Sequence, residues 1–265
     1  MKKRKFIDPL KGLNVKFRSG KKLEEWSRFE QTFKAYQIKL KQLFIIYNRY
    51  CSKYPSFKKN MEIGIKMMDA LKEDKQYQWS EDDLKKNKKT KSDLELCEID
   101  YEDFFLHAKI LMDYITRITP FFFDKKLVFS NQYYQGIPKR YFSFHKHKNW
   151  LSNSTSSYSH EHIPDEYKEH IIKKTDWFDD LQYFRDKYLV HPFYFGSRGF
   201  YYKKDGKTTP IWFHPGGCYT KPVMELPNIE KMMDNILEFL TFLNEFFNFQ
   251  LTGKRYVTIF KYEAD

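Results

Sequence analysis

Apolar and aromatic residues recur at spacings of three and four along residues 22–50, 57–73, 99–118 and 228–250. This spacing puts the apolar side chains on one face of an α-helix, so each stretch is predicted to be an amphipathic helix. In the first stretch, the face carries Trp26, Phe29, Phe33, Tyr36, Leu40, Leu43, Phe44 and Tyr47. In the third, Asp100 or Ser92 is a candidate N-cap, and Pro120 falls just past the expected end.

A further helical pattern begins at Pro164 and runs to Val190, with a break expected near Thr175. Proline and acidic residues suit the first turn of a helix, where the dipole is positive. Pro192 ends the pattern, because the residue before a proline is biased away from helical backbone. His191 is therefore expected at a helix C-terminus.

The period changes between residues 199 and 214, where two aromatic and β-branched runs flank Asp205 and Gly206. This pattern predicts a β-hairpin, within an insertion over residues 196–226. A short strand is expected near the end, from Arg255 to Tyr262. The predicted fold class is mainly α: an antiparallel helical bundle with an inserted β-hairpin before the last long helix.

The lysine-rich run from Lys85 to Lys91 is interpreted as an exposed loop or connector, with a nucleic-acid contact as the alternative. As a connector, this run would divide the chain into two parts. Residues 1–95 would form an N-terminal helical extension, and residues 96–265 the bundle with its hairpin and terminal strand.

The formal net charge of +12 favours a polyanionic partner such as RNA, although the same charge can serve solubility alone. Three cysteines without C-x-x-C spacing argue against a disulfide framework and a thiolate metal site. No apolar segment follows the basic N-terminus, and charged residues interrupt the greasiest stretch, residues 229–251. We therefore expect a soluble, cytoplasmic protein with no membrane association.

Arg185 and His191 are the strongest candidates for chemistry. A guanidinium grips phosphate through two parallel hydrogen bonds, and an imidazole transfers protons near neutral pH. Together they suit metal-free RNA cleavage, in which the 2′-OH attacks the adjacent phosphate. The plainer alternative is that Arg185 pairs with Asp179 or Asp186 and that His191 caps a helix.

The stretch from Tyr183 to Pro192, with Arg185, Asp186 and His191 in it, resembles the R-x(4–6)-H signature of the HEPN superfamily. Residues 101–119 also resemble the opening helix of a HEPN bundle, and residues 229–249 lie where such domains keep their last helix. The resemblance covers roughly residues 95–252.

This resemblance implies a helical bundle that dimerises, with two Arg/His pairs forming a composite site. Many members are metal-independent endoribonucleases of toxin–antitoxin, abortive-infection and anti-phage systems, whereas others only bind RNA or a partner. By this resemblance Arg185 would stabilise the phosphate, His191 would be catalytic and Asp186 would orient the site. Some members carry a modifiable tyrosine two residues after the histidine, but Phe193 occupies that place here.

Three functions follow. The first is an endoribonuclease without cofactor or metal, acting as a homodimer with a possible antitoxin or defence partner, whose RNA contacts include Lys187, Lys139 and Arg140. The second is an inactive HEPN-like module that binds RNA, a nucleotide or a protein. The third is a metal-dependent enzyme using two histidine pairs, His145 with His147 and His160 with His162, if each lies on a strand.

Two aromatic runs and two lysines each have two interpretations. The aromatic runs Phe121–Phe123 and Tyr133–Tyr134 could stack bases, but core or dimer packing is the commoner role. Lys146 and Lys148 could follow a phosphate backbone, or they could be scattered surface charge.

Overall fold

The computed structural model describes residues 2–13, 23–72, 81–122, 133–134, 137–138, 143–153, 163–186, 198–202, 208–212, 224–225 and 227–253. Over these residues the chain is mainly helical. Its elements are α2 (Leu23–Lys72), α3 (Glu81–Ile118), η1 (Thr119–Phe122), β1 (Tyr133–Tyr134), β2 (Ile137–Pro138), α4 (Phe144–Ser152), α5 (Asp165–Lys174), α6 (Trp177–Phe184), β3 (Arg198–Tyr202), β4 (Thr208–Trp212), β5 (Met224–Glu225) and α7 (Ile229–Thr252).

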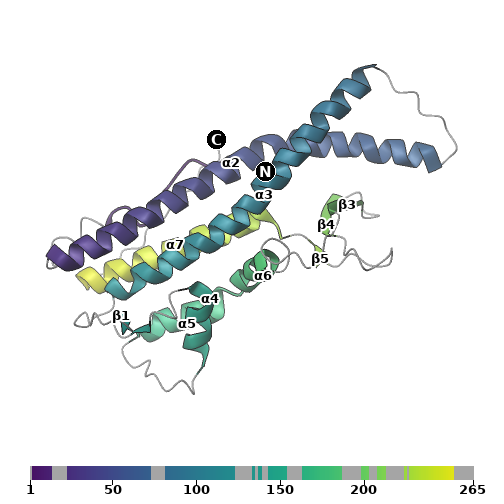
Figure 1. Cartoon of the computed structure of the whole chain (residues 1–265). Helices are drawn as coiled ribbons and strands as arrows, with labels where there is room; N and C mark the ends of the chain where they lie inside the picture. The colour runs from purple at the N-terminus through teal and green to yellow at the C-terminus, as the bar shows by residue number, and fades with distance from the viewer. Residues whose placement is uncertain are drawn as a thin grey trace.

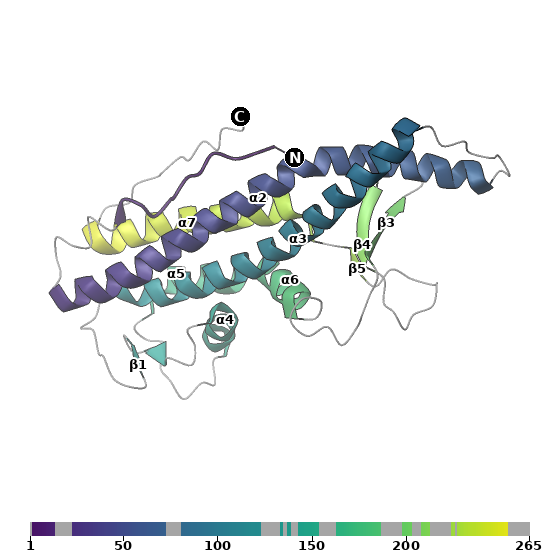
Figure 2. The same ribbon diagram turned by 45° about the horizontal axis from the view of Figure 1, so that its top comes forward.

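Three long helices, α2, α3 and α7, lie side by side, and the short helices α4, α5 and α6 lie along one side of them (Figures 1 and 2). Phe29 near the start of α2 packs edge-on against Phe121 and Phe122, just after α3, so α2 and α3 are antiparallel. Phe122 stacks on Phe247 near the end of α7, with ring centroids 4.0 Å apart. Helix α7 therefore runs with α3 and against α2.

One hydrophobic core joins these helices. It includes buried side chains from α2, α3, α4, α5, α6 and α7. Helix α7 has the predicted apolar stripe and two defined ends. At its start the Asn228 side chain accepts hydrogen bonds from the backbone N–H groups of Glu230 and Lys231. At its end Gly253 adopts φ 66°, a left-handed conformation that glycine takes without strain.

The N-terminal arm, residues 2–13, is mostly irregular and is bound to the bundle by polar contacts. The Arg4 guanidinium pairs with Asp234 of α7 at 2.5 Å, and the Arg4 backbone N–H donates to Asn48 of α2. Asp8 accepts hydrogen bonds from the Tyr36 hydroxyl and the Gln37 amide. These contacts tie the arm to the first and last long helices.

The predicted separation of residues 22–50 from residues 57–73 is wrong, because α2 is continuous from Leu23 to Lys72 with Pro55 inside it. A proline removes one backbone donor and crowds the preceding turn, but it does not have to end a helix whose preceding turns are packed in the core. Pro55 itself is exposed, while Tyr50 and Tyr54 pack against each other and Tyr50 packs against Tyr101 of α3.

The predicted loop at Lys85–Lys91 is also wrong, since these residues belong to α3. Lysine is a fair helix former, and no glycine or proline interrupts residues 81–118. Ser92 and Asp100 consequently lie within the helix and cap nothing. Asp100 is buried and pairs with Arg49 at 2.5 Å and Lys53 at 3.3 Å, which joins α3 to α2. The end of α3 at Ile118, before Pro120, is as predicted.

Strands β3 and β4 pair antiparallel, with Arg198 opposite Trp212 and Tyr202 opposite Thr208, and β5 pairs with β4. The intervening residues 203–207 and the expected terminal strand, residues 255–262, lie outside the described residues. The expected division between residues 95 and 96 stays a prediction. That position lies within α3, and the side chains of α2 share one core with those of α7.

Candidate functional site

Helix α6 carries the candidate arginine, and packing fixes its position. The break expected near Thr175 is present, because α5 ends at Lys174 and α6 begins at Trp177. An isolated helix of 8 residues is unstable in water, so tertiary contacts must hold it. Phe178 packs against Phe144 of α4, and Phe184 packs against Tyr101 and Phe105 of α3. The C-terminal end of α6 is thereby anchored to a long helix of the bundle.

Arg185 and Asp186 directly follow this anchored turn. The backbone of Arg185 continues the helical conformation, at φ −59° and ψ −49°. Its Nη1 lies 2.6 Å from Oδ1 of Asp186, and both side chains are about one-third exposed (29% and 32%). The pairing of Arg185 with Asp186 that the sequence left open as an alternative is thus present. A pairing with Asp179 is not seen among the described contacts; Asp179 binds Lys148.

Gln182 completes this arrangement, and sequence analysis missed it. Its Nε2 donates to Oδ2 of Asp186 at 3.0 Å, across one turn of the helix. Its Oε1 is buried and has no hydrogen-bond partner among the described residues. The spacing in the sequence could have predicted this contact, because glutamine and aspartate four residues apart in a helix are placed to form a hydrogen bond.

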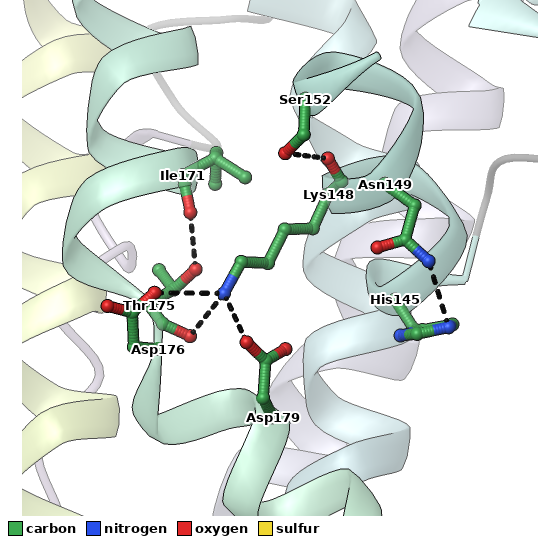
Figure 3. A network of polar contacts seen from close by, with 8 residues as sticks. All are labelled: His145, Lys148, Asn149, Ser152, Ile171, Thr175, Asp176 and Asp179. Carbon is green, nitrogen blue, oxygen red and sulfur yellow. Dashed lines mark hydrogen bonds and ion pairs between the residues drawn. The ribbon is translucent and has the colours of Figure 1, made fainter.

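Lys148 holds α4 to the junction of α5 and α6 (Figure 3). Its ammonium group donates to the Thr175 carbonyl at 3.2 Å, to Asp176 at 3.2 Å and to Asp179 at 2.8 Å. The Lys148 side chain is only 9% exposed. All three of its donors are used inside the protein, so the suggested role in following a phosphate backbone is wrong for Lys148.

The other predicted site residues, His191, Lys187, Lys139 and Arg140, lie outside the described residues. The structure therefore brings together Arg185 and Asp186 of the candidate set, and adds Gln182.

The first histidine pair does not form a metal site, because His145 and His147 lie on helix α4 and not on a strand. Residues two apart on a helix point to nearly opposite sides. His147 is fully buried, and its Nε2 shares a hydrogen bond of 3.1 Å with the Tyr167 hydroxyl, whereas His145 bonds Asn149. His160 and His162 lie outside the described residues. Among the residues that are described, no group of three or more His, Cys, Asp or Glu side chains could hold a metal.

Phe121 and Phe122 are buried, so these two rings take the predicted packing role and are not free to stack on bases. Side chains of Phe123, Tyr133 and Tyr134 are not described.

A hollow of about 620 Å³ lies between α5 and α7, and no sequence pattern predicted it. His170 is one of its lining residues and is stacked flat on Phe242, with ring centroids 3.5 Å apart. Burial, with a smaller contribution from Lys174, lowers the pKa of His170 to about 4. Its imidazole is therefore neutral at physiological pH. The lining also includes Asp165, Glu166, Glu169, Lys173 and Lys174, so the hollow has no single sign of charge.

No protein-family model, curated protein or solved structure matches this chain. Among the described helices, none is long and apolar enough to cross a membrane.

Proposed function

We propose that this protein is a metal-independent endoribonuclease of the HEPN type that acts as a homodimer on RNA in the cytoplasm. The observation that carries the proposal is the position of Arg185. Its guanidinium is partly exposed at the end of a short helix whose last turn is packed against α3. An arginine on a rigid support can stabilise charge on a phosphate without first being ordered.

In the proposed reaction the 2′-oxygen of a ribose attacks the adjacent phosphorus and the bond from phosphorus to the 5′-oxygen breaks. His191 of one subunit accepts the proton of the 2′-OH, and His191 of the other donates a proton to the leaving 5′-oxygen. Arg185 stabilises the negative charge that grows on the phosphate oxygens. The products are a 2′,3′-cyclic phosphate and a 5′-hydroxyl.

Other parts of the chain complete the proposal. Lys187, Lys139 and Arg140 bind the RNA backbone, consistent with the net charge of +12. Residues 196–226 form a β-hairpin insertion, which the antiparallel pairing of β3 with β4 supports. An antitoxin or another protein of an anti-phage defence system is the proposed regulatory partner.

Purified protein incubated with total RNA in excess EDTA tests the proposal. We expect the wild type to cut RNA, leaving cyclic phosphate ends. Arg185→Ala and His191→Ala should each lower the cleavage rate by about 100-fold or more. Arg117→Ala, at an exposed arginine of α3, and His145→Ala, on α4, are matched controls that should retain activity.

If the wild type cuts no RNA, with or without added divalent metal, the endoribonuclease proposal fails. RNA binding that depends on Arg185 would then favour the alternative, an inactive HEPN-like module that binds RNA, a nucleotide or a partner.

A further inference from the structure

The three side chains at the end of α6 form a connected set in which Gln182 holds Asp186 and Asp186 holds Arg185. We call this set the Asp186 bridge. One carboxylate oxygen takes the Gln182 amide at 3.0 Å, and the other takes the Arg185 guanidinium at 2.6 Å. Both carboxylate oxygens are thus engaged by donors that belong to the protein.

We infer that Asp186 is an internal competitor for RNA phosphate at Arg185, so that the bridge restrains the site until a phosphate displaces the carboxylate. This inference rests on the proposed function, because it assumes that Arg185 binds phosphate.

The geometry supports competition between Asp186 and phosphate for Arg185, and not a role for Asp186 in orienting the arginine alone. A phosphate is bound best by two parallel N–H groups of a guanidinium, and Nη1 is already occupied by Asp186 at a short, charge-assisted distance. The carboxylate also places a negative charge where a phosphate oxygen would approach. A phosphate that binds through Nη1 therefore has to break this ion pair and to overcome repulsion from the carboxylate.

Because Gln182 orders the Asp186 carboxylate, Asp186 competes with phosphate for Arg185 more effectively than the carboxylate of an ordinary exposed ion pair would. An exposed ion pair contributes little because two mobile side chains must be ordered to form it. Here the Gln182 amide binds the second carboxylate oxygen, so two protein donors hold the Asp186 carboxylate. Asp186 is therefore already ordered beside Arg185.

The inference is tested by binding of a labelled 2′-O-methyl RNA oligonucleotide of mixed sequence, which has no 2′-OH to attack and so cannot be cleaved by the proposed route. Asp186→Asn keeps the shape of the side chain and removes its charge. We expect it to tighten binding by roughly two- to fivefold.

Asp180→Asn is the matched control. Asp180 lies on the same helix, is exposed, and loses the same charge. It should tighten binding less than Asp186→Asn does, because it acts only through the general field. In the Arg185→Ala background the effect of Asp186→Asn should fall to that of Asp180→Asn, since the competition requires the guanidinium.

Three results separate the outcomes. Tighter binding by Asp186→Asn that depends on Arg185 supports the inference. The second outcome is that Arg185→Ala weakens binding, but Asp186→Asn either weakens it or changes it no more than Asp180→Asn does. This outcome overturns the inference and leaves the proposed function standing. Binding that is unaffected by Arg185→Ala overturns both, because Arg185 then holds no phosphate.

Discussion

At the scale of single residues, His170 shows how burial changes the pKa of a side chain. No feature of the sequence around His170 predicts this change. It lies on α5 against Phe242 of α7, and its pKa falls to about 4 from an ordinary value of 6.5. Between these two pH values the unfolded chain binds a proton at this histidine and the folded chain does not. The free energy of unfolding therefore rises with pH across this window and falls on acidification.

We predict that His170→Phe will flatten this pH dependence, because phenylalanine can keep the stack on Phe242 and cannot be protonated. Urea unfolding of the wild type and the variant at pH 7 and pH 4.5 measures the effect. The wild type should lose more stability than the variant between the two values. His145→Gln, on α4, serves as the control and should behave as the wild type does; an equal loss in His170→Phe would refute the assignment.

The residues of the candidate site differ in how far sequence could predict them. Arg185 and Asp186 stand next to each other, so their pairing was foreseeable from the sequence alone. The Lys148 network was not, because its partners Thr175, Asp176 and Asp179 come more than twenty-five residues later. Only the packing of α4 beside the junction of α5 and α6 brings these groups together.

At the scale of elements, the helices with a regular apolar stripe were predicted well, and those without one were not. The end of α3 followed from Pro120, and the start of α7 followed from the apolar stripe that begins at residue 228. The polar first half of α3 has no apolar stripe at residues 85–91, and its helical state comes from continuity with a packed segment. Helix α4 was missed because its nine residues lie in an aromatic and basic region without clear period.

We predict that Lys148→Met will destabilise the protein by about 1–3 kcal/mol, because the Thr175 carbonyl loses its donor and two aspartates lose a buried cation. Methionine has a similar length and no charge, so the change removes the contacts with little loss of packing. Lys146→Met, at an exposed position two residues earlier, is the control and should change stability by less than about 0.5 kcal/mol. Equal unfolding midpoints for the two variants in urea would contradict the role of Lys148 shown in Figure 3.

At the scale of the whole molecule, the long helices share one hydrophobic core. Apolar side chains of α2, among them Phe29, Phe33 and Tyr36, lie in the same core as those of α3 and α7. Contacts of this kind link positions far apart in sequence, and periodicity within a segment carries no information about which segments meet.

We therefore predict that a fragment of residues 96–265 will not fold alone. It would expose the faces of α3 and α7 that α2 covers, and it would begin within α3. Circular dichroism and thermal melting of the fragment beside the full chain provide the measurement. A cooperative melt with native-like helix content in the fragment would show that residues 1–95 are a separable extension after all.

The ion pair between Arg4 and Asp234 has a consequence for how the protein is made. During synthesis Arg4 leaves the ribosome long before α7 does, because Asp234 lies 230 residues further along the chain. Helices α2 and α3 can pair early, but the apolar face that α7 covers stays exposed until α7 has been translated. Chaperones that bind exposed apolar surface on nascent chains should therefore stay on this protein until α7 has emerged.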